Sequence, residues 1–118
     1  MLHEWIDSCD VYLVTGYTDM RKGINGLAAI VQGKLFMDPF GKSLYLFCGR
    51  SRCKMKGLLW DGDGFLLLYK RLENGSFQWP RDDTEVKKLT AQQTRWLLEG
   101  LSIEQSKAIK TAKPGIIY

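Results

Sequence analysis

The apolar residues of the first third of the chain change from the spacing of a strand to that of a helix. The β-rich run Val11–Val14 ends at Thr15-Gly16 and predicts a first strand. Beyond it, apolar residues recur at spacings of four, three, four and four, as on one side of a helix: Met20, Ile24, Leu27, Val31 and Leu35. Because Thr18 can cap a helix and Asp19 complements its positive end, we expect this helix to begin at these residues.

From residue 43 the pattern becomes that of successive strands. They are expected at Leu44–Cys48, Lys54–Trp60, Phe65–Leu72 and Ser76–Trp79, with a further short strand at Glu85–Leu89. The turns between them contain Asp-Gly and Asn-Gly pairs, which favour hairpins because they adopt positive φ at little steric cost. Pro80 ends the series because proline cannot donate a hydrogen bond to a neighbouring strand. The pattern predicts an antiparallel meander.

A second, shorter helix is expected after Thr90. The stretch Thr90-Ala91-Gln92-Gln93 has the form of a capping box, and Gly100 is placed to end the helix. Its apolar face consists of Trp96, Leu97 and Leu101. One or two further turns are expected over Ser102–Ile109, and residues 110–118 read as a loosely held tail. The fold class is therefore α+β: an antiparallel β-meander packed with one longer helix after the first strand and a short C-terminal helix, in a single domain over residues 1–109.

Length and composition agree with one globular domain. The chain has 118 residues, 45% hydrophobic and 25% charged, which excludes a chain that is disordered as a whole. Its longest apolar run, Phe65–Tyr69, is far short of the ~20 residues of a membrane span. A secretory signal has a basic flank before an apolar stretch, and the start of this chain has none. We expect a cytoplasmic protein with no membrane partner.

Positive charge is concentrated in the second part of the chain. The formal net charge is +4, but residues 1–49 hold four Lys/Arg against five Asp/Glu, whereas residues 50–118 hold thirteen against eight. The densest block contains Arg50, Arg52, Lys54 and Lys56. Such a block favours a polyanion as partner, and it is equally typical of a solvated edge strand protected by its lysines. Arg21 and Lys22 stand in the first turn of the expected helix, where cations oppose the helix dipole, which favours a contact role.

Side chains alternate along a strand, so some of these cations share a face with aromatic rings. Lys54 and Lys56 share one face of their strand, and Tyr69 and Arg71 share one face of the next. Phe77 and Trp79 likewise share a face. Sheets that present aromatic rings beside cations can stack bases and bind phosphates. The alternative, that these aromatic residues form the core while the lysines point to water, stays open.

The residues offer little catalytic chemistry. The one histidine, His3, stands near the terminus, and neither a GxSxG nucleophile motif nor a GxxxxGK[ST] phosphate loop is present. Asp19, Asp61 and Asp63 could hold two magnesium ions, although aspartate is also ordinary at a helix start and in a hairpin turn. The spacing of the three cysteines does not fit zinc, so reduced thiols are expected at Cys9, Cys48 and Cys53. No metal or cofactor is expected.

Several motifs then occur in a fixed order. They are Thr18-Asp19-Met20-Arg21-Lys22-Gly23, Asn25-Gly26-Leu27-Ala28, Asp38-Pro39-Phe40, Leu59-Trp60-Asp61-Gly62-Asp63-Gly64-Phe65 and Lys70-Arg71-Leu72-Glu73-Asn74-Gly75-Ser76-Phe77-Gln78-Trp79-Pro80. Over about residues 11–101 they resemble the small accessory protein encoded by the second reading frame of the IS-sixty-six group of bacterial insertion sequences. Two positions depart from the family pattern. Cys53 replaces an acid and so raises the local positive charge, and Gly57 replaces an apolar residue, which predicts a weak point or a bulge.

The resemblance implies a non-enzymatic helper for DNA transposition, because the catalytic carboxylates of these elements belong to a separate, larger transposase. The implied partners are that transposase and DNA, with no small-molecule substrate, and the oligomeric state stays open. The motif positions carried over are Asp19, Met20, Arg21, Lys22, Trp60, Asp61, Lys70, Arg71, Trp79 and Pro80.

We therefore expect a basic contact surface for DNA, the transposase or both. Its candidate residues are Arg21, Lys22, Arg50, Arg52, Lys54, Lys56, Lys70 and Arg71. Two alternatives remain at this point. One is a metal-dependent nuclease or strand-transfer subunit that uses Asp19, Asp61 and Asp63. The other is a protein-only module that bridges transposase subunits by edge-strand pairing.

Overall fold

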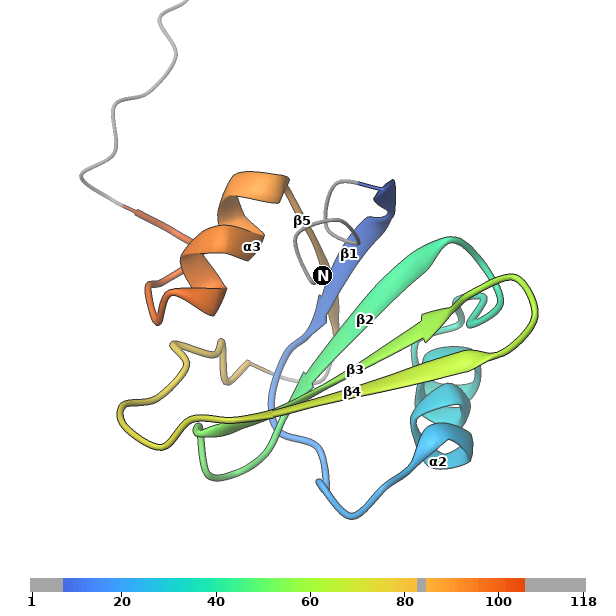
Figure 1. Cartoon of the computed structure of the whole chain (residues 1–118), viewed down its shortest axis with the longest axis horizontal. Helices are drawn as coiled ribbons and strands as arrows, with labels where there is room; N and C mark the ends of the chain where they lie inside the picture. Colours follow the sequence, from blue (N-terminus) through green and yellow to red (C-terminus); the bar gives the residue numbers. More distant parts are fainter. Residues whose placement is uncertain (1–7, 83–84, 106–118) are drawn as a thin grey trace, which may run out of the picture.

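The computed structural model describes residues 8–82 and 85–105, which form one mixed sheet and two helical segments. Figure 1 shows the strands side by side, with α2 and α3 at opposite sides of the sheet. In chain order the elements are β1 (Asp10–Val14), α2 (Ile24–Ala29), η1 (Ile30–Lys34), β2 (Ser43–Cys48), β3 (Lys54–Trp60), β4 (Phe65–Arg71), β5 (Val86–Leu89) and α3 (Ala91–Leu98).

The five strands lie in the order β4-β3-β2-β1-β5. Strands β2, β3 and β4 are antiparallel neighbours, so the predicted meander and the α+β fold class are confirmed. The β1–β2 pair is parallel, with Val11 opposite Leu44. A parallel pair needs a long crossover, and the segment that carries α2 and η1 supplies it. The expected short strand near the C-terminus is β5, which pairs antiparallel with β1.

Hydrophobic side chains cover both faces of the sheet. We call the two sides the α2 face and the α3 face, after the helix that lies on each. On the α2 face, Leu27 and Val31 are fully buried against Tyr45, Phe47 and Leu58 of the strands. The α3 face buries a larger set, which comprises Val11, Leu13, Leu44, Leu46, Cys48, Met55, Leu59, Phe77, Trp79, Leu89, Leu97 and Ile103. The sheet therefore lies between two apolar layers.

The first helix begins later than predicted. Its apolar stripe is confirmed, since Leu27 and Val31 are buried and Met20, Ile24 and Leu35 pack against the same cluster. However, α2 starts at Ile24, with Gly23 rather than Thr18 at its cap. The Asp19 carboxylate instead accepts a hydrogen bond from the backbone N–H of Arg21 at 2.9 Å and closes a turn. This local bond replaces the expected first helical turn, because Asp side chains compete with the helix for backbone donors.

The segment Ser76–Trp79 is not a strand, which corrects the prediction. It crosses the α3 face as an extended chain, with the Phe77 N–H donating to the Arg52 carbonyl at 2.8 Å. Its two aromatic side chains are nevertheless buried in the core, as one of the two readings expected. The alternation of residues was therefore informative about burial but did not predict the backbone partner.

Strand β3 has the predicted bounds and no bulge at Gly57. That residue pairs with Leu46 on one side and Leu68 on the other. A Cβ at position 57 would lie 3.2 Å from Leu44 Cδ1, so the leucine side chain fills the space that a larger residue would take. The expected weak point is therefore packed by its neighbours.

The capping box of α3 is confirmed by two reciprocal hydrogen bonds. Thr90 Oγ1 accepts from the Gln93 N–H at 3.1 Å, and Gln93 Oε1 accepts from the Thr90 N–H at 3.0 Å. The helix is followed by Gly100 at a φ of 82°, a conformation that glycine adopts without strain. Residues 102–105 are not helical, which corrects part of the expected extra turns. The remainder of that stretch and the expected tail at 110–118 lie outside the described residues.

No helix in the described part of the chain is long and apolar enough to cross a bilayer.

Candidate nucleic-acid interface

Strands β3 and β4 place three cations and a tyrosine next to one another on the α2 face. Their register sets Lys54 opposite Arg71 and Lys56 opposite Tyr69. Because residues paired across a sheet point to the same face, the four side chains form a two-by-two group. The Lys56 Nζ lies 5.6 Å from the centre of the Tyr69 ring.

The loop after β1 brings two more cations to this group. The backbone N–H of Thr18 donates to the Cys48 carbonyl at 2.8 Å, which fixes the loop beside the end of β2. Further along, the Lys22 carbonyl accepts a hydrogen bond from Lys56 Nζ at 2.9 Å. Arg21, between these anchors, forms an exposed ion pair of 2.7 Å with Asp19. Hydrogen bonds from Arg21 hold the pKa of the Asp19 carboxyl well below its usual range, so this carboxylate stays charged.

A hollow of about 450 Å³ opens between the loop after β1 and the β2–β3 turn. Its lining includes the cations Arg21, Arg50 and Lys54 and one acid, Asp19. At its rim, the Arg50 guanidinium lies over the Tyr17 ring, 4.6 Å from the ring centre, and donates to the Tyr17 hydroxyl at 2.8 Å. The loop and turn approach closely because Gly49 has no side chain. A Cβ there would lie 2.6 Å from Met20 Cγ.

We call the resulting set of residues the basic surface. It comprises Arg21, Lys22, Arg50, Lys54, Lys56 and Arg71. Two acids pair within it, Asp19 with Arg21 and Glu73 with Arg71, the latter at 2.9 Å. Cations thus outnumber acids by six to two, and the surface can bind a chain of phosphates or carboxylates.

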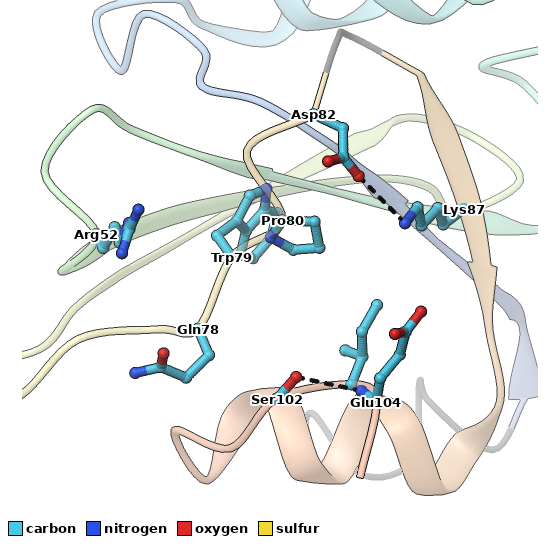
Figure 2. A pocket seen from close by; sticks show the side chains of 9 residues that line it. Arg52, Gln78, Trp79, Pro80, Asp82, Lys87, Ser102 and Glu104 are labelled. Atoms are coloured by element: carbon cyan, nitrogen blue, oxygen red, sulfur yellow. Dashed lines mark hydrogen bonds and ion pairs between the residues drawn. The ribbon is translucent and has the colours of Figure 1, made fainter. Parts of the chain in front are cut away.

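The two other predicted cations lie apart from this surface. Lys70 pairs with Met55, a core residue of the α3 face, so strand alternation directs Lys70 to that side. Arg52 lines a different hollow, of about 290 Å³, together with Trp79 and Pro80. Figure 2 shows this hollow, where Asp82 and Lys87 form an ion pair of 3.4 Å away from Arg52. The prediction of one common surface is therefore wrong for Lys70 and Arg52.

Two residues important to this region were missed from sequence. Tyr17 carries no motif, and its role depends on Arg50, which is distant in the chain. Arg81 donates to three carbonyl oxygens: Gly16 at 3.4 Å, Gly49 at 3.0 Å and Arg50 at 3.2 Å. It thereby joins the loop after β1 to the β2–β3 turn. In the sequence, the one signal for a role of Arg81 was its position directly after the family motif Trp79-Pro80.

The remaining motif positions serve the fold. Trp60 forms an aromatic cluster with Phe40 and Phe65, with ring centres 5.2 and 4.9 Å from its own. Asp61 begins the β3–β4 turn, where its N–H donates to the Gly64 carbonyl at 2.8 Å. Trp79 is buried and donates from its indole to the Val14 carbonyl at 2.8 Å. Met20 packs against the core of the α2 face.

The carboxylates proposed for metal binding do not converge. Asp19 lines the hollow beside Lys54, at the start of β3, whereas Asp61 and Asp63 follow its end. Seven residues of strand separate the two places, roughly 20 Å at ~3.3 Å per residue. No group of three or more His, Cys, Asp or Glu within residues 8–82 and 85–105 could hold a metal ion. The geometry gives no support to the two-metal alternative.

The described cysteines differ in burial. Cys48 is fully buried in β2, and burial raises the pKa of its thiol to about 11. Cys53 is half-buried in the β2–β3 turn, with its sulfur 3.0 Å from Ser51 Oγ. Cys9 is half-buried, and burial raises the pKa of its thiol as well. Cys48 is thus a protonated part of the core.

The fold and this surface define a small α+β protein with one strongly cationic face. The family model of the IS66 Orf2-like protein matches residues 9–108, and the chain belongs to this family. It is similar to protein y4hO of Sinorhizobium fredii (strain NBRC 101917 / NGR234), with 38% identity over 91 residues, 77% of this chain and 79% of that protein. Protein y4jC of the same organism is 31% identical over 108 residues, 88% of this chain and 89% of the relative. Both relatives are described as uncharacterized, and no solved structure matches. Family membership associates the chain with transposition of insertion sequences.

Proposed function

We propose that this protein assists transposition without catalysing it, and that it contacts the DNA of the insertion sequence through the basic surface. The observation that carries the proposal is the convergence of six cations from three segments that are distant in the chain. Phosphate contacts from such side chains supply most of the sequence-independent affinity of DNA-binding proteins. The surface is also anchored to the fold, through the Thr18–Cys48 and Lys56–Lys22 hydrogen bonds.

The local acids do not cancel this function. The Asp19–Arg21 and Glu73–Arg71 ion pairs are solvent-exposed, and exposed pairs of this kind contribute little free energy. A phosphate can therefore compete with either carboxylate for its arginine, while the pair holds the guanidinium in place beforehand. Lys22, Lys54 and Lys56 add charge beside these pairs. The arrangement favours a polyanion that passes over the whole surface.

A salt titration of binding to a duplex that carries one end of the element tests the proposal. The logarithm of the affinity is expected to fall linearly with the logarithm of the salt concentration, with a slope of about −0.9 for each phosphate contacted. Six contacts would give a slope of about −5.4. Absence of binding at low salt, or an affinity that does not change with salt, would contradict a DNA surface.

We also propose that the protein binds the transposase of the same element and acts in the bacterial cytoplasm. Co-purification with the transposase, with and without nuclease treatment, tests this part. A complex that survives nuclease treatment is expected if the two proteins touch directly. Transposase binding together with a flat salt titration would favour the protein-only bridging alternative instead.

A further inference from the structure

We propose that the basic surface takes unpaired DNA strands, with the rings of Tyr17 and Tyr69 serving as platforms on which bases stack. This inference rests on the proposed function and adds the class of DNA to it. It depends on the way the exposed tyrosines, and the cations beside them, are arranged around Lys54.

Tyr17 is held in place although its side chain is 55% exposed. The Arg50 guanidinium lies over its ring, 4.6 Å from the ring centre, and bonds to its hydroxyl at 2.8 Å. Arg50 is positioned in turn by Arg81, which donates to the Arg50 carbonyl at 3.2 Å. A ring fixed in this way loses little conformational entropy when a base stacks on it.

Tyr69 repeats the same combination on β4. Its side chain is 55% exposed, and the Lys56 ammonium lies 5.6 Å from its ring centre. Lys56 is anchored by its hydrogen bond to the Lys22 carbonyl. Two other tyrosines, Tyr12 and Tyr45, instead stack on each other, with 5.5 Å between their ring centres, and Tyr45 is buried. Among the described tyrosines, Tyr17 and Tyr69 are the ones that are more than half exposed and have a cation over the ring.

Lys54 lies between the two platforms. It lines the hollow whose rim carries Tyr17, and it is two residues from Lys56 on the same face of β3, roughly 7 Å along the strand. A duplex hides the faces of its bases, so rings on a protein surface meet mainly its backbone. An unpaired strand instead offers bases to the rings and phosphates to the cations between them, which is how single-strand binders achieve affinity. The alternation of ring, cation and ring therefore fits a single strand.

The test compares the full chain binding to a labelled 15-nucleotide single strand and to the matching 15-base-pair duplex by fluorescence anisotropy. The variants are Tyr17→Ala and Tyr69→Ala, with Tyr69→Phe to keep the ring and Phe36→Ala as control. Phe36 is 88% exposed, follows η1 in the chain and does not line the hollow of the basic surface. Circular dichroism of each variant confirms that it is folded.

The wild type is expected to bind the single strand more tightly than the duplex. Each alanine variant should weaken single-strand binding roughly 5- to 150-fold, the range for loss of one stacked base, with duplex binding changed less than about twofold. Tyr69→Phe and Phe36→Ala should bind as the wild type does. In a contrary outcome, the wild type binds DNA while the alanine variants lose affinity for neither DNA, or lose it equally for the single strand and the duplex. That result overturns this inference and leaves the proposed function standing. If the wild type binds neither DNA, both are overturned.

Discussion

The indole N–H of Trp79 donates a 2.8 Å hydrogen bond to the carbonyl oxygen of Val14, although 65 residues separate the two in the chain. The bond fastens the extended segment after β4 to the end of β1, inside the core of the α3 face. The loop that carries Tyr17 leaves the sheet directly after Val14. The core hydrogen bond of Trp79, a family-motif residue, thus lies next to the point where the loop of the basic surface leaves the sheet.

Trp79→Phe is expected to lower the free energy of unfolding by about 1–3 kcal/mol, because it leaves a buried carbonyl without its donor and reduces the buried volume. Urea denaturation followed by circular dichroism measures the loss. Trp96→Phe, at a half-exposed position on α3, is the matched control and should lose less. Equal losses in the two variants would show that the Trp79–Val14 bond contributes no stability.

Arg81→Met is expected to destabilise the protein by about 1–3 kcal/mol, since hydrogen bonds from a charged donor to three backbone carbonyls are lost. Because one of those carbonyls belongs to Arg50, the variant should also weaken DNA binding. Arg95→Met, at an exposed position on α3, is the control for removing a guanidinium. A DNA affinity that stays at the wild-type value in Arg81→Met would contradict the positioning role.

The stability of the protein is expected to fall as the pH rises from about 8.5 towards 11. Burial raises the pKa of the Cys48 thiol to about 11 in the folded state, against roughly 8.5 in an unfolded chain. Above the unfolded value the unfolded chain releases this proton while the folded state still binds it, so ionisation favours unfolding. Urea midpoints measured across this pH range follow the effect.

The control for this pH dependence is Cys48→Ala, which removes the thiol. Its free energy of unfolding should decline less steeply over the same range than that of the wild type. Alkylation provides an independent readout, since Cys48 is fully buried and Cys53 is half-buried in a turn. Native protein treated with iodoacetamide should be modified at Cys53 well before Cys48. Identical pH slopes in variant and wild type would contradict the assignment.

Local signals were sufficient for several elements. Strand β3 has the bounds that its sequence pattern predicted, and the Thr90–Gln93 capping box forms with both of its hydrogen bonds. The shared face of Lys54 and Lys56 follows from strand alternation alone. Each of these features depends on residues that are close in sequence, which is why the sequence was informative.

Features that depend on distant partners could not be predicted in this way. Ser76–Trp79 did not form a strand because its backbone meets the Arg52 carbonyl instead of a neighbouring strand. The later start of α2 has a local cause, the Asp19–Arg21 hydrogen bond, which competes with a helical cap that the same residues could equally form. The parallel pairing of β1 with β2 has no local signature.

The candidate site could be predicted in part. Alternation already separates Lys70 from Arg71, because adjacent strand residues point to opposite faces. By contrast, Arg50 and Arg52 lie in a turn, where no alternation applies, and they line different hollows. The positioning role of Arg81 depends on three carbonyls that only the folded chain brings together.

The central claim is that the basic surface, and not the net charge of the chain, binds DNA. The most direct measurement compares two double charge reversals, Lys22→Glu with Lys54→Glu on the basic surface and Arg52→Glu with Lys70→Glu away from it, in salt titrations on element-end DNA. Both change the net charge equally and leave the Asp19–Arg21 and Glu73–Arg71 pairs intact. The first is expected to lower affinity about tenfold or more and to make the log–log slope shallower by roughly 1.4 for a single strand or 1.8 for a duplex, while the second stays near wild type. Equal effects of the two double variants, or no effect of the first, would contradict the account.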